Sequence, residues 1–485
     1  MSISFHSRSA FQALGRATVF LTACVGLGVT LAMIPGSAGA VPGFARQTGM
    51  ACPACHTVYP ELTPLGRRWK LNGFTWTSKE PAVSVTDDRS GTDDQGDVDV
   101  SIAQIPPLSL LFQAYYTDWN RPPLGTGPDG KTQNGPTYFP SQVSLLEAGR
   151  ISDKFGGWVQ LTYLQQTNSV GIDNMELRYA DHTEDRGLVW GATANNNPTF
   201  QDVWNTGGSN SAGSTAFGIP YFPVGNILAF GTTKSPLILL EGTNSAGLGA
   251  YAFYKDSLYG ELTFYRSAKP GVTFLDSSST TLAPGGGTID GLAPYWRIAY
   301  EANWGRNSLE VGAIGMFANF TPNVPAVTSL SQAGRYTDVG VDSQYEWIGD
   351  DHIVTVEAMF LGEHSTNNTA LVDALAASNG SDTLYRTSLT ASYYYQRRWG
   401  GFINFTSING RSDPLFYCAG TCDGSPRAQW ESLELNYLPW LNTKLILQYN
   451  LYNHLGAASM PAFQGTAPPK ASDANALVFA IWLAF

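Results

Sequence analysis

Most of the sequence consists of short segments, each about ten residues long and rich in aromatic and β-branched residues, separated by clusters of turn-forming residues. Several segments alternate: within 441–451, Leu445 and Leu447 share one face, while Lys444 and Gln448 share the other. One apolar and one polar face are typical of a strand between lipid and a polar interior. We count sixteen such segments: 108–118, 140–150, 155–166, 171–181, 187–194, 245–255, 258–267, 293–304, 307–318, 335–347, 351–363, 382–395, 398–410, 427–438, 440–453 and 474–485.

The connections between these segments differ in length in a regular way. Tight connections are expected at 151–154, 255–257, 305–306 and 348–350 and at the Leu438–Pro439 break. Long connections mostly separate them, at 119–139, 195–244, 268–292, 319–334, 364–381, 411–426 and 454–473. Alternating short and long loops are typical of outer-membrane barrels. We therefore predict an all-β fold, a porin-like transmembrane β-barrel of about 16 strands over residues 108–485, with an exported soluble β-protein as the alternative.

The first forty residues have the features of an export signal. Arg8 and Arg16 precede an apolar stretch over 17–34, which is followed by Pro35 and the small-residue site 38–40. We predict that 1–40 is a cleaved signal peptide, and the alternative is an uncleaved anchor. The expected location is the bacterial outer membrane, with its lipid as a partner.

The overall charge and its distribution along the chain each give further information. Only 14% of the residues are charged and the net charge is −11, which argues against nucleic acid as a partner. Residues 80–107 contain seven acidic residues and Arg89 as the single basic residue, together with three prolines, and we interpret them as an acidic linker. The linker separates the predicted barrel from an N-terminal segment over 41–79.

The N-terminal segment contains the motif C-x-x-C-H at residues 52–56. This is the attachment motif of c-type haem. Two thiols three residues apart, Cys52 and Cys55, can each add to one vinyl group of a porphyrin, and His56 can then bind the iron. We expect one covalent haem c, with Cys52 and Cys55 as thioethers and His56 as the axial metal ligand. A thioredoxin-like or zinc site is disfavoured, because the expected surrounding elements are missing from the sequence.

The second axial ligand stays open, because no other His and no Met lies between His56 and the linker. Weak candidates are Lys70, Met359, His182, His352 or water. Met359 falls on the same face of its predicted strand as the polar residues of that strand, so we expect it to face the lumen.

Two more cysteines, Cys418 and Cys422, fall in a predicted surface loop. In an exported protein, we expect them to form a disulfide that closes the loop.

The N-terminal segment resembles the outer-membrane fused cytochrome-porins of iron-oxidising bacteria. The resemblance is carried by C-x-x-C-H and by GFARQTG (43–49), PELT (60–63), GR (66–67) and KLNGF (70–74). Leu65 and Trp69 stand where many relatives have Phe, which bears only on local haem packing. The resemblance implies an iron(II) oxidoreductase of the iron:cytochrome c reductase type. It also implies iron(II) as the electron donor and a periplasmic cytochrome or copper protein as the acceptor.

The height of a membrane barrel sets where the haem has to lie. The outward apolar band is about 25 Å tall, and electron tunnelling decays steeply with distance. We therefore expect the cytochrome segment to be inserted in the lumen. Iron(II) is expected to meet oxygen ligands of the long loops, where His364 and His454 are loop histidines. The alternatives are a general extracellular electron conduit and a diffusion porin that carries a haem sensor.

Overall fold

The computed structural model describes residues 43–57, 61–75, 108–121, 134–135, 137–165, 168–185, 187–198, 202–206, 245–267, 287–322, 333–366, 372, 377–415, 424–440, 442–455 and 470–484. The chain divides into two units, Met1–Val41 and Pro42–Phe485, and every described residue belongs to the second. The predicted signal peptide (1–40), the acidic linker (80–107) and both Cys418 and Cys422 lie outside the described residues.

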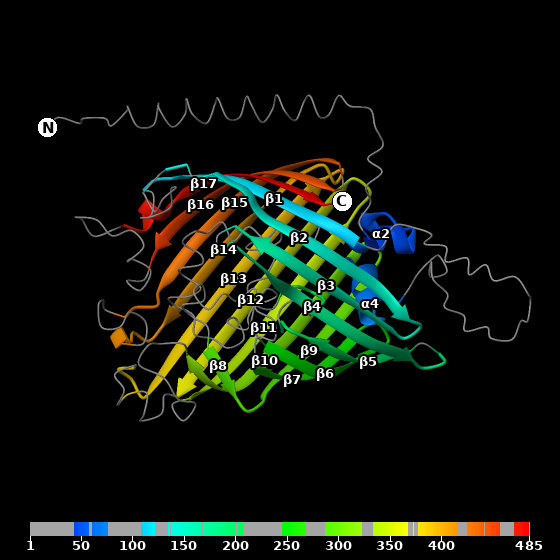
Figure 1. Cartoon of the computed structure of the whole chain (residues 1–485), viewed down its shortest axis with the longest axis horizontal. Coiled ribbons are helices and arrows are strands. Elements are labelled where there is room, and N and C mark those ends of the chain that lie inside the picture. Colours follow the sequence, from blue (N-terminus) through cyan, green and yellow to red (C-terminus); the bar gives the residue numbers. More distant parts are fainter. Residues whose placement is uncertain are drawn as a thin grey trace, which may run out of the picture. The chain divides into compact units, whose positions relative to one another are not determined.

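The second unit contains one closed antiparallel sheet (Figure 1). Apart from β8, each strand pairs with its neighbours along the chain, and the sheet closes because β1 pairs with both β2 and β17. The strands are β1 (Leu108–Trp119), β2 (Thr137–Ser152), β3 (Phe155–Leu164), β4 (Ser169–His182), β5 (Leu188–Asn195), β6 (Ser245–Tyr254), β7 (Leu258–Ser267), β8 (Gly287–Asp290), β9 (Ala293–Trp304), β10 (Asn307–Pro322), β11 (Gly334–Ile348), β12 (His352–Thr366), β13 (Ser381–Tyr395), β14 (Trp399–Gly410), β15 (Ala428–Trp440), β16 (Thr443–His454) and β17 (Ala476–Ala484). A short 3-10 helix, η6 (Ala471–Ala474), precedes β17.

The predicted barrel is confirmed. Strands β8 and β9 occupy one position, since both pair with β10, so the 17 strands in the described part of the chain fill sixteen positions. Strand β8 is the one strand of the described residues that the sequence did not predict; it lies in the expected long connection and is separated from β9 by Gly291, whose φ is +78°. The expected break at Leu438–Pro439 is wrong by two residues, because β15 continues to Trp440.

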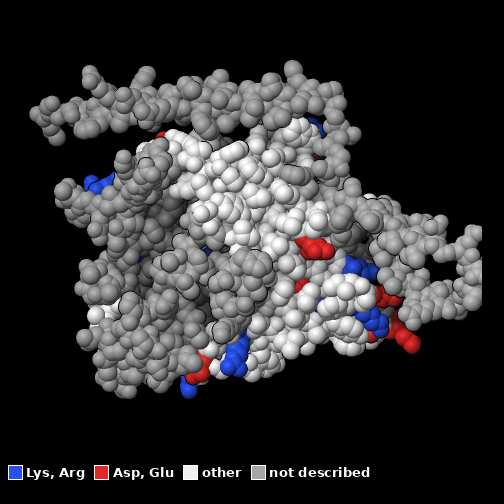
Figure 2. All heavy atoms as spheres, viewed as in Figure 1, with Lys and Arg blue, Asp and Glu red and all other residues white. Residues whose placement is uncertain are grey.

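The two faces of the sheet differ as the alternation predicted. On the outer face large apolar side chains are exposed, and Leu248 and Ile403 have exposed fractions of 68% and 61%. On the inner face, the charged side chains of Arg178 and Lys444 are 0% exposed. Figure 2 shows few charged side chains on the middle of the outer wall. An apolar exterior over a polar interior is the arrangement of a barrel surrounded by lipid.

The two ends of the barrel differ in their connections. One end carries the tight turns at 153–154, 255–257, 305–306, 349–351 and 396–398, and we call it the short-turn end. The opposite, long-loop end carries most of the connections that lie outside the described residues. This confirms the predicted alternation of short and long connections, except that β3 and β4 are joined at the long-loop end by only 165–168.

Ahead of the barrel, the described residues form three helices: α2 (Gly43–Thr48), α3 (Cys52–Cys55) and α4 (Pro64–Leu71). Helix α4 begins where its sequence favours it, because the Thr63 hydroxyl accepts a hydrogen bond from the Gly66 amide and Pro64 occupies the first helical turn. We call residues 43–57 and 61–75 the plug segment. Figure 1 shows α2 and α4 (blue) near the end of the barrel that holds the C-terminus. None of the helices in the described ranges is long and apolar enough to cross a membrane.

Candidate cofactor site

A cavity of about 230 Å³ lies between the plug segment and the barrel wall. The plug contributes residues of the C-x-x-C-H motif to the lining of the cavity. The wall contributes residues from strands on both sides of the pairing between β1 and β17. Its walls are largely apolar and aromatic, and the lining includes Trp69, Leu111, Leu146, Trp158 and Trp482. The one motif for which we predicted cofactor chemistry therefore opens into a space enclosed by apolar side chains.

Helix α3 is a single turn that begins at Cys52 and ends at Cys55, with Pro53 in its first turn. Residues three apart in a helix lie on the same face, and both cysteines line the cavity. Burial raises the pKa of both thiols above the ordinary value, so the protonated form is favoured. The helix thus presents two protonated thiols, three residues apart along the chain, to the cavity.

The orientation of His56 is set by a main-chain contact. Its Nδ1 lies 3.2 Å from the Glu61 carbonyl oxygen, and because a carbonyl can only accept, Nδ1 carries the hydrogen. The neutral ring then has its lone pair on Nε2, the atom that binds a metal when Nδ1 donates to a carbonyl. His56 lines the same cavity as both cysteines. The residues present therefore fit a covalently bound c-type haem.

The motif is held in place by close packing of α3 against α4. A Cβ atom at Gly66 would lie 2.2 Å from the Cys55 carbonyl oxygen, so the helices approach too closely for any other residue there. The Thr63 hydroxyl donates to the Ala54 carbonyl at 2.7 Å, and the Thr63 amide donates to the Cys55 carbonyl at 2.9 Å. The peptide groups of α3 are thereby bonded to the beginning of α4.

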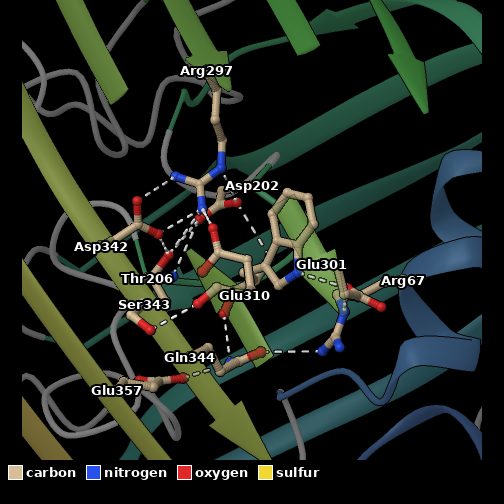
Figure 3. Close-up of polar contacts among 11 residues, drawn as sticks. Arg67, Asp202, Thr206, Arg297, Glu301, Glu310, Asp342, Ser343, Gln344 and Glu357 are labelled. Carbon is tan, nitrogen blue, oxygen red and sulfur yellow. Dashed lines mark hydrogen bonds and ion pairs between the residues drawn. The ribbon is translucent and has the colours of Figure 1, made fainter. Parts of the chain in front are cut away.

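Arg67 fixes α4 to the barrel. Its Nε lies 2.8 Å from Glu301 Oε2 on β9, and its Nη1 lies 2.7 Å from Glu346 Oε2 on β11. Nη2 donates to the Ser308 hydroxyl at 3.0 Å. Burial alone would lower the pKa of Arg67, but the attraction of Glu346 and Glu301 raises it above the ordinary value. The guanidinium is therefore charged and bonded to three neighbouring strands. Figure 3 shows its bonds to Glu301 on β9 and to Gln344 on β11.

Further contacts join the end of α4 and the His56 loop to the wall. Lys70 Nζ lies 3.2 Å from Glu176 Oε2 on β4, and burial lowers the pKa of Lys70 although Glu176 opposes that effect. The Tyr251 hydroxyl donates to the Leu71 carbonyl at 2.7 Å. Beside His56, burial raises the pKa of Glu61 to about 7, while a hydrogen bond from the Thr57 hydroxyl lowers it. The plug segment is thus bonded to the wall on several sides.

Residues 202–206, which follow β5, also lie inside the barrel, and we call them the inner segment. Trp204 Nε1 donates at 2.8 Å to Glu301 Oε2, the same oxygen that accepts from Arg67. Arg297 of β9 holds this segment, with Nε 3.2 Å from Asp202 Oδ1 and its guanidinium 5.1 Å from the Trp204 ring centre. Figure 3 shows the clusters around Arg67 and Arg297 side by side. Asn205 lines the cavity, so the inner segment forms part of its wall.

The candidates for the second axial ligand are placed differently. Lys70 lines the cavity, but its ammonium is paired with Glu176. Met359 faces the interior as predicted and is buried, yet it packs in a separate cluster that includes Tyr265 and Tyr336. His182 and His352 are exposed residues beside short turns and do not line the cavity.

Other expectations are changed by the structure. His364 is not a loop residue, since it lies within β12 on the outer face, and His454 is the last residue of β16. Within the described residues, no group of three or more His, Cys, Asp or Glu side chains could hold a metal ion. The long loops that we expected to meet iron(II) fall largely outside the described residues.

Sequence reasoning did not find the residues that attach the plug to the wall. Arg67 was quoted only as part of a motif, and its partner Glu301 lies 234 positions away along the chain. Trp204 and Arg397, which also surround the site, lie in a long connection and in a short turn. The alternation of inward and outward positions along the strands was the available signal. It places the charged residues Glu301 and Glu346 at inward positions, where a charge requires a partner.

No family model and no curated protein matches the sequence. Solved structures that are similar to the chain include the anion-selective porin of Comamonas acidovorans, with 11% identity and a TM-score of 0.45 over 78% of this chain and 98% of that one. They also include OmpF of Salmonella typhi in complex with daunomycin, with 12% identity and a TM-score of 0.44 over 78% and 97%. The fold assignment rests on the strand pairing of this chain.

Proposed function

We propose that the chain is an outer-membrane electron-transfer protein that binds one covalent haem c through Cys52, Cys55 and His56. It oxidises extracellular iron(II) and delivers the electrons to a periplasmic cytochrome or copper protein. The observation that carries the proposal is the opening of the C-x-x-C-H motif into an apolar cavity shared by the plug segment and the barrel wall. The apolar outer wall supports the membrane location.

The position of the plug supports transfer across the membrane. Its contacts reach strands on several sides of the barrel, through Arg67, Lys70 and Leu71. A carrier held inside the barrel shortens the distance that an electron has to tunnel between the two sides. When bound, the haem would supply the one-electron chemistry that converts iron(II) to iron(III). The Glu61 carbonyl would orient the His56 imidazole toward the iron, and the mainly apolar lining of the cavity would surround the porphyrin.

Covalent haem is tested first. Mature protein from cells that attach c-type haem should retain peroxidase stain after boiling in detergent, and the double variant Cys52→Ala, Cys55→Ala should lose it. The His56→Ala variant should keep its thioethers and show a shifted Soret band, because the axial imidazole is lost. Haem stain that persists in the double-cysteine variant would overturn the assignment.

The donor is tested with the purified, haem-loaded protein and a soluble periplasmic acceptor. Iron(II) should be oxidised faster than unrelated one-electron donors, and neutralising loop carboxylates in groups should slow only the iron(II) reaction. Equal rates for all donors, with no effect of the loop variants, would favour a general conduit over a dedicated iron(II) oxidoreductase.

A diffusion porin makes the opposite prediction for small solutes. Arg67 ties the plug segment, and Arg297 ties the inner segment, to inward-facing residues of the wall, which supports a filled lumen. We therefore expect planar-bilayer conductance far below that of an open sixteen-strand porin. A large, steady conductance of the haem-loaded protein would favour the porin alternative.

A further inference from the structure

The cavity has an unusual balance of charge. Three charged side chains of the described residues line it: Lys70, Glu176 and Arg397. Lys70 and Glu176 form an ion pair with each other. This leaves Arg397 as the cation that no carboxylate of the described residues compensates.

Arg397 lies in the turn 396–398 between β13 and β14, at the short-turn end. Its Nη1 donates to the main-chain carbonyls of His56 at 3.3 Å and Thr57 at 3.4 Å. A guanidinium carries five N–H donors in a planar fork, and these contacts use only one of its three nitrogens. The side chain is half-buried.

A half-buried cation without a counter-ion destabilises the site. A carboxylate in the cavity would offset this cost, and the guanidinium fork matches a carboxylate with two parallel hydrogen bonds. Haem has two propionate carboxylates. A haem attached to Cys52 and Cys55 would bring these groups into the cavity that Arg397 lines.

We infer that Arg397 is a positioning residue that binds a haem propionate and raises the reduction potential of the haem. The inference rests on the proposed function. Neutralising a propionate beside the iron favours the less positive, reduced state of the metal. Because Arg397 also binds the His56 carbonyl, one barrel turn would hold both the peptide of the axial ligand and the edge of the porphyrin.

The test compares variants of the haem-loaded full chain. Arg397→Gln removes the charge, and Arg397→Lys keeps the charge but loses the planar fork. Position 397 has a φ of +55°, and its neighbour Gln396 adopts a φ of +51°, so glutamine is compatible with this turn. The matched control is Arg398→Gln, since Arg398 is exposed and does not line the cavity.

Midpoint potentials come from spectroelectrochemical titration. In Arg397→Gln the ratio of oxidised to reduced haem at a fixed potential should rise roughly three- to tenfold, where a tenfold change corresponds to about 59 mV for one electron. The potential should also gain a stronger pH dependence, because the propionate loses the charge that keeps it ionised. Arg397→Lys should show a smaller shift, and Arg398→Gln should match the parent protein.

Resonance Raman spectra provide the second measurement. The propionate bending band should move in Arg397→Gln, while haem content and Soret maximum stay those of the parent protein. An unchanged bending band and potential in Arg397→Gln would overturn this inference while leaving the haem assignment intact. Equal shifts in Arg397→Gln and Arg398→Gln would also overturn it, by showing a general surface-charge effect. A parent protein without covalent haem would instead overturn the proposed function.

Discussion

The plug segment meets the barrel through two surfaces of different character. One is charged and comprises Arg67 and Lys70 with Glu301, Glu346 and Glu176. The other is aromatic: the rings of Phe44 and Trp69 are 4.2 Å apart, those of Trp69 and Phe74 are 5.3 Å apart, and Trp158 of the wall belongs to the same cluster. The charged surface faces β4, β9 and β11, whereas the aromatic surface faces β2 and β3.

The two surfaces contribute in different ways. Burying a charged pair costs desolvation energy that its attraction only repays when the geometry is good, so such pairs contribute more to orientation than to stability. Aromatic burial stabilises without demanding one geometry. We therefore expect the charged surface to set the rotation of α4 in the barrel, and the aromatic surface to supply most of the energy that holds it there.

The two largest expected effects come from the two surfaces themselves, and the first is produced by breaking the charged surface on one side only. Arg67→Met leaves Glu301 and Glu346 buried without their partner and should lower the free energy of unfolding by about 3–5 kcal/mol. Adding Glu301→Gln and Glu346→Gln should restore most of that loss. The control is Arg68→Met, because Arg68 pairs with Asp256 at the surface and should contribute about 1 kcal/mol or less.

Urea titration in lipid vesicles, followed by tryptophan fluorescence, measures these differences. If Arg67→Met and Arg68→Met were equally stable, the charged surface would not constrain the plug. Failure of the glutamine substitutions to restore stability would mean that Arg67 acts through packing.

Truncation of a side chain in the aromatic surface should lower stability in a way that neutralising the buried glutamates does not reverse. Trp69→Ala removes a nearly fully buried ring and should cost about 3–5 kcal/mol. Here neutralising Glu301 and Glu346 should give no recovery, because no charge has lost its partner. A recovery as large as that of Arg67→Met would show that the two surfaces are not independent.

A smaller loss in the free energy of unfolding is expected from a change that involves neither surface and only alters how closely α3 and α4 approach each other. Gly66→Ala places a methyl group against the Cys55 carbonyl and should cost about 1–3 kcal/mol by overpacking. Displacement of α3 should also reduce covalent haem per protein, measured by the pyridine haemochrome spectrum. Gly260→Ala is the control, since nothing lies within 4 Å of a Cβ atom there. Full haem content in Gly66→Ala would show that α3 and α4 can separate without consequence.

The smallest effect is expected from one hydrogen bond at the end of α4. Tyr251→Phe removes the donor to the Leu71 carbonyl and should cost about 0.5–1.5 kcal/mol. Urea titration again provides the measurement. A loss as large as that of Arg67→Met would indicate that Tyr251, which also lies under the Arg178 guanidinium, has a wider role.

The strands were predictable because their aromatic and β-branched segments are separated by turn-forming residues, and because several of them alternate apolar and polar residues, as Lys444 and Leu445 do in β16. Strand β8 was not predicted, because its four residues before Gly291 are too few to show an alternation of apolar and polar positions. Cys52, Cys55 and His56 could be chosen because their chemistry depends on adjacent positions. The pairing of Arg67 with Glu301 could not, since it depends on how a closed sheet and a helix meet in space, and no local pattern records that.

The closure of the sheet has a consequence for biogenesis. The cavity is lined by Leu111 from β1 and by Trp482 and Ala484 from β17, the two strands whose pairing closes the sheet. These strands pair with each other only when the barrel closes, with Leu111 opposite Ala484. An assembly intermediate with an open seam therefore has an incomplete cavity, and the candidate cofactor site is completed by the same step that seals the barrel.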